Sequence, residues 1–289
     1  MRQFSIRELE RLSGIKAHTI RAWENRYAIF NPVRNSRNIR HYTLDDVKLL
    51  LNINLLLNTG RRISQLAGML PGEIHSLVKG LEDTYALKNK LISELITSMY
   101  ESSFYQFEKV LDSSVAYLGI DTSIHKVVIP FLEKIDLLSY KESSAEVHFA
   151  VTAIRKKLIM GLESKKDNVP MAKTALFFLP EGEHYDLLLL YMTYVARYRG
   201  LQTVYLGTNL PMQDLEKVTL EIRPDYLFTY LPADNPYDAS ALIAYLKRLL
   251  PNSKLMIAEP GDIPRKHRNG NAVFFHFRDI EQVMVNEMV

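Results

Sequence analysis

From residue 174 onward, short apolar segments alternate with longer segments of helical character. We expect strands at 174–179, 202–206, 225–231 and 254–258, with helices at 183–199, 211–222 and 237–250 between them. Strands joined by single helices run parallel with right-handed crossovers, so this region predicts a doubly wound α/β sheet of the flavodoxin or Rossmann-like class. Ligands of such sheets bind beyond the carboxyl ends of the strands, here the loops at 180–184, 207–211, 230–235 and 259–262.

The segment before this sheet is expected to be an α-helical bundle. Between Ile74 and Lys165 helix breakers are few, and apolar residues recur at helical spacing. Two stripes are formed by Leu77, Leu81, Leu87, Leu91, Leu95 and Ile96, and by Phe104, Phe107, Val110, Leu111 and Val115. The turn signal Leu-Pro-Gly-Glu at 70–73 marks a boundary before the bundle. The predicted domains are therefore residues 1–72, 73–168 and 169–289.

Charge is distributed unevenly between the first 70 residues and the rest of the chain. The whole chain carries 36 Lys and Arg against 33 Asp and Glu, a net charge of +3. Residues 1–70 hold 12 basic and 5 acidic residues, which is +7, and the remainder holds 24 against 28, which is −4. This asymmetry predicts a polyanionic partner for the N-terminal segment, nucleic acid first, and charge alone leaves a solvated basic face as the alternative.

The composition excludes several classes of protein. The sequence has no cysteine, which excludes disulfides, thiolate metal sites and cysteine nucleophiles and favours an intracellular protein. The longest apolar run, at 187–192, is far shorter than the roughly 20 residues of a membrane span. The charged start at 1–9 does not fit a signal peptide. We expect a cytoplasmic protein that does not bind a membrane.

The basic segment predicts a winged helix-turn-helix. Ser5 and Glu8 have the spacing of a capping box at the start of a first short helix. A second helix at 16–27 carries Trp23 on its inward face, so the two helices form a helix-turn-helix candidate. The basic, Asn-rich segment at 31–43 fits a small β wing that reaches a phosphate backbone.

Residues 3–70 resemble the DNA-binding domain of the MerR family. The family's ordered motifs are matched by Ser5, Ile6, Glu8, Leu9, Thr19 to Glu24, Arg26, Tyr27, Pro32, Arg34, Arg40, Tyr42, Asp46, Val47, Gly60 and Ile63. The resemblance implies a recognition helix in the major groove and a wing on the flanking phosphates. The implied groove residues are Thr19, Arg21, Arg26 and Tyr27, and the implied phosphate contacts are Arg34, Arg37, Arg40 and Tyr42. Guanidinium groups suit both tasks, because they read guanine edges and bind phosphates.

The wing departs from the family pattern at its tip. The segment at 35–38, Asn-Ser-Arg-Asn, has no glycine where a tight turn is expected. Asn also adopts the left-handed conformation, so we expect an Asn-based tip of altered geometry.

The architecture as a whole resembles the cobalamin-binding regulators of the CarH/LitR type, most closely at 200–211. The resemblance implies that His184 is the lower axial ligand of cobalt, and no free metal ion is expected. Helix capping is the simpler role for His184, since it stands at an expected helix start. Other positions of the implied site differ from the family pattern. Leu187 replaces a glycine, Gly261 is the one glycine left of a pair, and Thr229 stands where Ser is usual. In the bundle, Leu137 replaces a Trp, and Val147 with His148 replaces a Glu-His pair.

Two interpretations of the C-terminal region stay open. It is either a sensor-like region that has lost cobalamin binding, kept for oligomerisation or another ligand, or a cobalamin-responsive region with an unusual site. A corrinoid-carrying methyltransferase-type subunit is the alternative from another class, and the basic head argues against it. No paired carboxylates, nucleophile–base set or phosphate-binding glycine loop indicates an enzyme.

We therefore predict a DNA-binding transcriptional regulator, with no cofactor expected and cobalamin as the candidate if one is bound. Its expected partners are duplex DNA with an inverted repeat, further copies of this chain in a homo-oligomer, and RNA polymerase.

Overall fold

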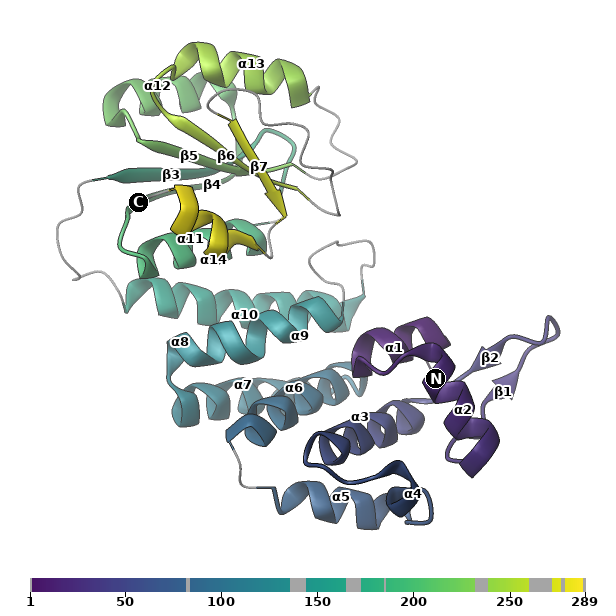
Figure 1. Cartoon of the computed structure of the whole chain (residues 1–289). Helices are drawn as coiled ribbons and strands as arrows, with labels where there is room; N and C mark the ends of the chain where they lie inside the picture. Colours follow the sequence, from purple (N-terminus) through teal and green to yellow (C-terminus); the bar gives the residue numbers. More distant parts are fainter. Residues whose placement is uncertain are drawn as a thin grey trace. The chain divides into compact units, whose positions relative to one another are not determined.

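The computed structural model describes residues 2–81, 84–135, 144–164, 173–184, 186–231, 239–259, 272–276 and 279–287 (Figure 1). The chain divides into two compact units, Met1–Ile154 and Arg155–Val289. Helix α10 (Ala145–Glu163) runs through the residue at which the units divide.

The first unit begins with a winged helix-turn-helix, as predicted. Its elements are α1 (Ile6–Ser13), α2 (Ala17–Tyr27), β1 (Val33–Arg34), β2 (Arg40–His41), α3 (Leu44–Asn58) and α4 (Ile63–Leu66) (Figure 1). The capping box is present: Glu8 N–H donates to Ser5 Oγ at 3.2 Å, and Ser5 N–H donates to Glu8 Oε2 at 2.6 Å. Gly14 ends α1 with φ at 80°, a conformation that favours glycine because it has no Cβ.

Helix α5 (Pro71–Lys79) packs on the winged helix-turn-helix. Its residues Ile74 and Val78 are buried in a cluster with apolar residues of α3 and α4. The signal at 70–73 predicts a turn at a boundary, but Pro71 is the first residue of a helix. Proline and glycine serve a helix start as well as a turn, because the first helical N–H groups have no intrahelical partner. The packing of the head therefore continues past this signal.

Helices fill the rest of the first unit, as the apolar stripes predict. They are α6 (Thr84–Tyr100), α7 (Phe104–Leu118), α8 (Ile120–Ser123), the π-helical turn η1 (Ile124–Val128), α9 (Ile129–Lys134) and α10. Leu91, Leu95, Phe107 and Val110 are buried core residues of α6 and α7. Phe104 departs from its stripe and is 38% exposed, because it stands on the first turn of α7.

The second unit holds a five-stranded parallel sheet of the predicted class. The strands are β3 (Thr174–Pro180), β4 (Gln202–Leu210), β5 (Tyr226–Tyr230), β6 (Lys254–Glu259) and β7 (Ala272–His276), in the order β4-β3-β5-β6-β7. All four strand pairs are parallel. The winding direction reverses between β3 and β5, so the expected ligand crevice lies beyond the carboxyl ends of these two strands. β7 lies beyond the strands that the sequence predicts.

Helices cover both faces of this sheet. α12 (Met212–Ile222) and α13 (Ala239–Leu249) cover one face, and α11 (Leu187–Tyr198) and α14 (Ile280–Glu287) cover the other (Figure 1). Leu176 and Leu227 belong to the core on the α12 and α13 side. Because successive strand side chains point to opposite faces, Phe177 and Phe228 lie on the α11 side, where their rings stack with centroids 4.6 Å apart.

Candidate DNA-binding surface and C-terminal site

Helix α2 carries cations on the side opposite its buried residues. Ile20 is fully buried. Trp23 packs against the cluster of α3, α4 and α5, which confirms its predicted core role. Arg21 and Arg26 are exposed. The helix is thus anchored by one face and presents guanidinium groups on the other.

Glu10 of α1 fixes the start of α2, a role that sequence analysis missed. Its Oε2 accepts the Ala17 N–H at 3.1 Å, and its Oε1 lies 3.1 Å from Lys16 Nζ. Lys16, the residue at the N-cap position, supplies no side-chain cap of its own. The carboxylate of the first helix therefore satisfies a backbone donor of the second and defines the turn between them.

The wing tip is closed by asparagine side chains. Asn35 Oδ1 accepts the backbone N–H groups of Arg37 and Ile39, each at 3.0 Å. Asn38 has φ at 60°, which confirms the prediction of a left-handed Asn at the tip. Arg34 donates from Nη1 to Asn38 Oδ1 at 2.8 Å. The exposed Arg34 and Arg37 are therefore carried on an ordered turn.

Glu24 ties the recognition helix to the wing. Arg40 Nε donates to Glu24 Oε1 at 2.8 Å, and the Tyr42 hydroxyl donates to Glu24 Oε2 at 3.0 Å. The Arg40 and Glu24 side chains are only 24% and 11% exposed. Burial, followed by the hydrogen bond to Glu24, raises the pKa of Tyr42 well above its usual range. Glu24 is part of the family motif at Thr19 to Glu24. Its position in that motif does not indicate that its carboxylate joins α2 to the wing.

The position of Tyr42 requires a correction to the set of phosphate contacts. Its side chain is fully buried and its hydroxyl is used by Glu24, so the ring lies inside the head. Arg40 is half-buried and has one guanidinium N–H on the same carboxylate. Both residues hold β2 against α2, and Tyr42 is withdrawn as a phosphate contact.

Thr19 and Tyr27, the remaining predicted groove residues, are half-buried. The guanidinium carbon of Arg26 lies 5.3 Å from the centroid of the Tyr27 ring. This stacking restricts the Arg26 side chain and leaves its charge on the exposed side of α2.

In the second unit, Asn209 at the end of β4 holds the loop after β3. Gly182 N–H donates to Asn209 Oδ1 at 2.8 Å, and Asn209 N–H donates to the Glu183 carbonyl at 2.8 Å. His184 is exposed on this loop. Helix α11 begins at Leu187 with Asp186 at the N-cap position, so the prediction that His184 caps this helix is wrong.

The pKa values of Glu183, after β3, and of Tyr230, at the end of β5, are both raised. Burial raises the pKa of Glu183 above its usual range. Burial, followed by the negative charge of Glu183, raises the pKa of Tyr230 to about 12. Asp186 is paired with Arg155, whose Nη2 and Nε donate to Asp186 Oδ1 at 2.7 and 2.9 Å. Of the acidic side chains around the loop, Glu183 is thus partly desolvated and Asp186 is paired.

The residues implied for cobalamin fit the group unevenly. Thr229 is fully buried, and its Oγ1 has no hydrogen-bond partner among the described residues. Together with the exposed His184, it offers a donor at the expected edge of the sheet. Leu187 is fully buried in the first turn of α11, where the resemblance requires a glycine. The buried isobutyl group occupies that position, so this residue does not fit the implied site.

Of the remaining residues of the implied site, the structure describes Val147 and His148. Val147 is buried and His148 is exposed on α10, and the structure describes neither Leu137 nor Gly261. Across the described ranges, no group of three or more His, Asp or Glu side chains is placed to hold a metal ion. None of the helices described combines the length and hydropathy that a membrane span requires.

Comparison with known proteins identifies the type of the N-terminal DNA-binding head. Residues 4–73 match the family model described as MerR HTH family regulatory protein. The chain is a DNA-binding regulator with a MerR-type head. The regulator is 26% identical over 285 residues to the HTH-type transcriptional repressor CarH of Myxococcus xanthus, covering 92% of this chain and 91% of the relative. It is 24% identical over 245 residues to the HTH-type transcriptional repressor CarA of the same organism, covering 82% and 80%.

The fold of the regulator is similar to that of a corrinoid protein. The solved structure of the Methanosarcina barkeri monomethylamine corrinoid protein matches with a TM-score of 0.53 and 13% identity, covering 69% of this chain and 99% of that chain. The regulator therefore combines a MerR-type head with a cobalamin-binding-like region, and at this identity the likeness concerns the fold alone.

Proposed function

We propose that this MerR-family regulator controls transcription by binding an inverted repeat in duplex DNA as a dimer or higher oligomer, and that it is not an enzyme. The observation that carries the proposal is the exposed Arg21 and Arg26 on α2 beside the exposed Arg34 and Arg37 on the wing. One such head reads only a short half-site, so two heads are needed for useful specificity. The names of CarH and CarA support repression. RNA polymerase is a further partner in this proposal.

Each exposed side chain has a role in this proposal. Arg21 and Arg26, with Thr19 and Tyr27 beside them, read base edges in the major groove. Arg34 and Arg37 bind phosphates and set the register of the head on the duplex. Arg40 acts mainly by holding the wing through Glu24.

Selection from a random pool of duplexes tests the proposal. The intact protein should enrich duplexes that contain two copies of one half-site in inverted orientation. Light scattering on the purified protein should show an assembly larger than one chain. A pool that yields no repeated half-site would contradict the proposed mode of binding.

We further propose that the C-terminal region works without cobalamin. The fully buried Leu187 supports this, because its side chain stands where the implied site needs the space of a glycine. A cobalamin-responsive region is the second candidate, favoured by the exposed His184 and by the unpartnered hydroxyl of Thr229. Both candidates keep the DNA-binding head, and they differ only in what controls it.

An absorbance spectrum of the purified protein after incubation with cobalamins separates the two candidates. The first predicts no bound colour and no change in melting temperature, since a ligand that binds only the folded state must stabilise it. A red protein with a raised melting temperature, whose colour is lost in His184→Ala and kept in His148→Ala, would establish the second candidate. If the Leu187→Gly variant binds cobalamin and the wild-type protein does not, the leucine itself excludes the cofactor.

A further inference from the structure

The end of helix α6 contacts the first residues of the DNA-binding head. The rings of Tyr100 and Phe4 meet edge to face, with centroids 5.0 Å apart and an interplanar angle of 82°. The guanidinium carbon of Arg2 lies 4.6 Å from the Tyr100 centroid and 5.4 Å from the Phe4 centroid. Phe4 is fully buried. Tyr100 thus packs on a residue that belongs to the core of the head.

Phe4 connects this contact to the elements expected to read DNA. Its N–H donates to the Tyr42 carbonyl and its carbonyl accepts the Tyr42 N–H, both at 2.9 Å. Tyr42 in turn donates its hydroxyl to Glu24 of α2, which also accepts from Arg40 of β2. Two residues, Phe4 and Tyr42, therefore separate Tyr100 from both the recognition helix and the wing.

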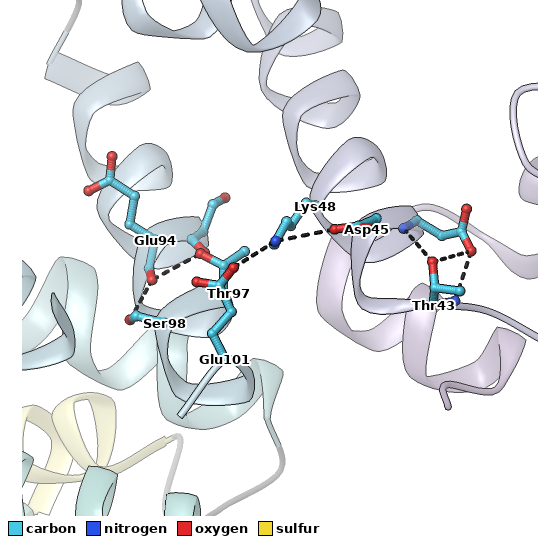
Figure 2. A network of polar contacts seen from close by, with 9 residues as sticks. Thr43, Asp45, Lys48, Glu94, Thr97, Ser98 and Glu101 are labelled. Atoms are coloured by element: carbon cyan, nitrogen blue, oxygen red, sulfur yellow. Dashed lines mark hydrogen bonds and ion pairs between the residues drawn. The ribbon is translucent and has the colours of Figure 1, made fainter. Parts of the chain in front are cut away.

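Two polar contacts also connect the DNA-binding head to the helices that follow it. Lys48 of α3 lies between Asp45 of its own helix, at 3.2 Å, and Glu101 after α6, at 2.6 Å (Figure 2). Lys134 of α9 donates from Nζ to the Leu12 carbonyl at 2.7 Å. Burial lowers the pKa of Lys134, while its position at the C-terminus of α1 is one that the helix dipole favours for a cation. These contacts join α3 to the end of α6 and α1 to α9, next to the contact of Tyr100 with Phe4.

We propose that Tyr100, outside the DNA-binding head, is a positioning residue for DNA recognition by this regulator. Its ring fixes Phe4, and through the Phe4–Tyr42 bridge it sets the position of the Glu24 carboxylate to which the recognition helix and the wing are both attached. A shift of the α6 terminus is passed to the arginines of α2 and the wing without any change in the residues that touch DNA. The inference rests on DNA binding through these two elements.

The chain contains its own reporter for this test. Its one tryptophan, Trp23, precedes Glu24 in α2 and is half-buried. We expect Tyr100→Leu, measured in the full-length protein, to change the emission maximum of Trp23 and to weaken binding to a duplex selected by the wild-type protein by roughly 3- to 10-fold, the range of a lost aromatic pair. The slope of log affinity against log salt should fall by about one, because the wing loses its fixed position on the phosphates.

Two further variants separate positioning from stability. Tyr100→Phe keeps the ring and should restore wild-type binding, salt slope and emission. Val110→Ala removes buried side-chain volume from α7 and should lower the melting temperature without changing Trp23 emission or the salt slope.

The proposal is overturned if Tyr100→Leu lowers the melting temperature but binds the selected duplex with the wild-type affinity and salt slope. It is also overturned if Val110→Ala changes all the readouts as much as Tyr100→Leu does. A wild-type protein that selects no duplex would instead contradict the proposed mode of DNA binding, so the two failures are distinguishable.

Discussion

Replacing Glu24 by alanine should weaken DNA binding although it makes the head more positive. The change removes one negative charge from a helix that carries exposed Arg21 and Arg26. If affinity depended on net charge alone, the variant would bind any duplex more tightly. The structure predicts the opposite, because Glu24 accepts hydrogen bonds from both Arg40 and Tyr42.

The expected loss of stability in Glu24→Ala follows from the hydrogen-bond donors that lose their acceptor. The fully buried Tyr42 hydroxyl loses its acceptor, and a buried donor without a partner costs about 2 kcal/mol. For a protein of this size, that loss lowers the melting temperature by roughly 4–8 °C. Release of the wing removes Arg34 and Arg37 from their fixed positions, so the slope of log affinity against log salt should fall by about two if both bind phosphates.

The assay is a salt titration of binding by fluorescence anisotropy, with a labelled duplex selected by the wild-type protein and a scrambled duplex of equal length. Asp45→Asn is the matched control, since it removes one negative charge of the head at a side chain that is 89% exposed. The control should bind as tightly as the wild-type protein or slightly more tightly. An affinity of Glu24→Ala equal to that of the control would refute the role given to this carboxylate.

Three further changes have defined outcomes. Arg26→Ala should cost about 1–3 kcal/mol on the selected duplex only, whereas Arg34→Ala should weaken binding to every duplex and lower the salt slope by about one, as competition with scrambled DNA will show. Burial raises the pKa of Glu94, so its stabilising contribution is present at low pH and is lost as pH rises through that pKa; Glu94→Gln should therefore raise the melting temperature at neutral pH and lose this advantage in acid. Thr229→Val should raise the melting temperature, because it removes a buried hydroxyl without a described partner, and a clear decrease would mean that this hydroxyl is hydrogen-bonded in solution.

Local chemistry made much of the fold predictable. The capping box of Ser5 and Glu8 acts within one turn of helix, so four letters are enough to locate the start of α1. The strand at 174–179 is recognisable because its residues after Thr174 are all buried and are therefore apolar. The left-handed Asn38 was predictable for a similar reason, since few residues other than glycine accept that conformation.

The parts that sequence analysis missed depend on partners far away in the chain. Tyr42 and Glu24 are 18 residues apart, and the motif that contains both says nothing about the direction of either side chain. The boundary at 70–73 failed as a turn because the burial of Ile74 by α3 and α4 decides whether the chain continues into a packed helix. The loop that carries His184 is likewise bound by a distant residue, Asn209, which the sequence does not indicate.

The contact of Phe4 with Tyr100 has a consequence for where a foreign effector region can be joined to this head. An effector region joined at 70–73 would carry a foreign residue in place of Tyr100, and the edge of the head around Arg2 and Phe4 would lose the surface it is built against. A unit that keeps the contacts of the head must include Glu101, which pairs with Lys48, and Lys134, which binds the Leu12 carbonyl. A chimaera made from this chain should therefore be joined beyond the end of α9.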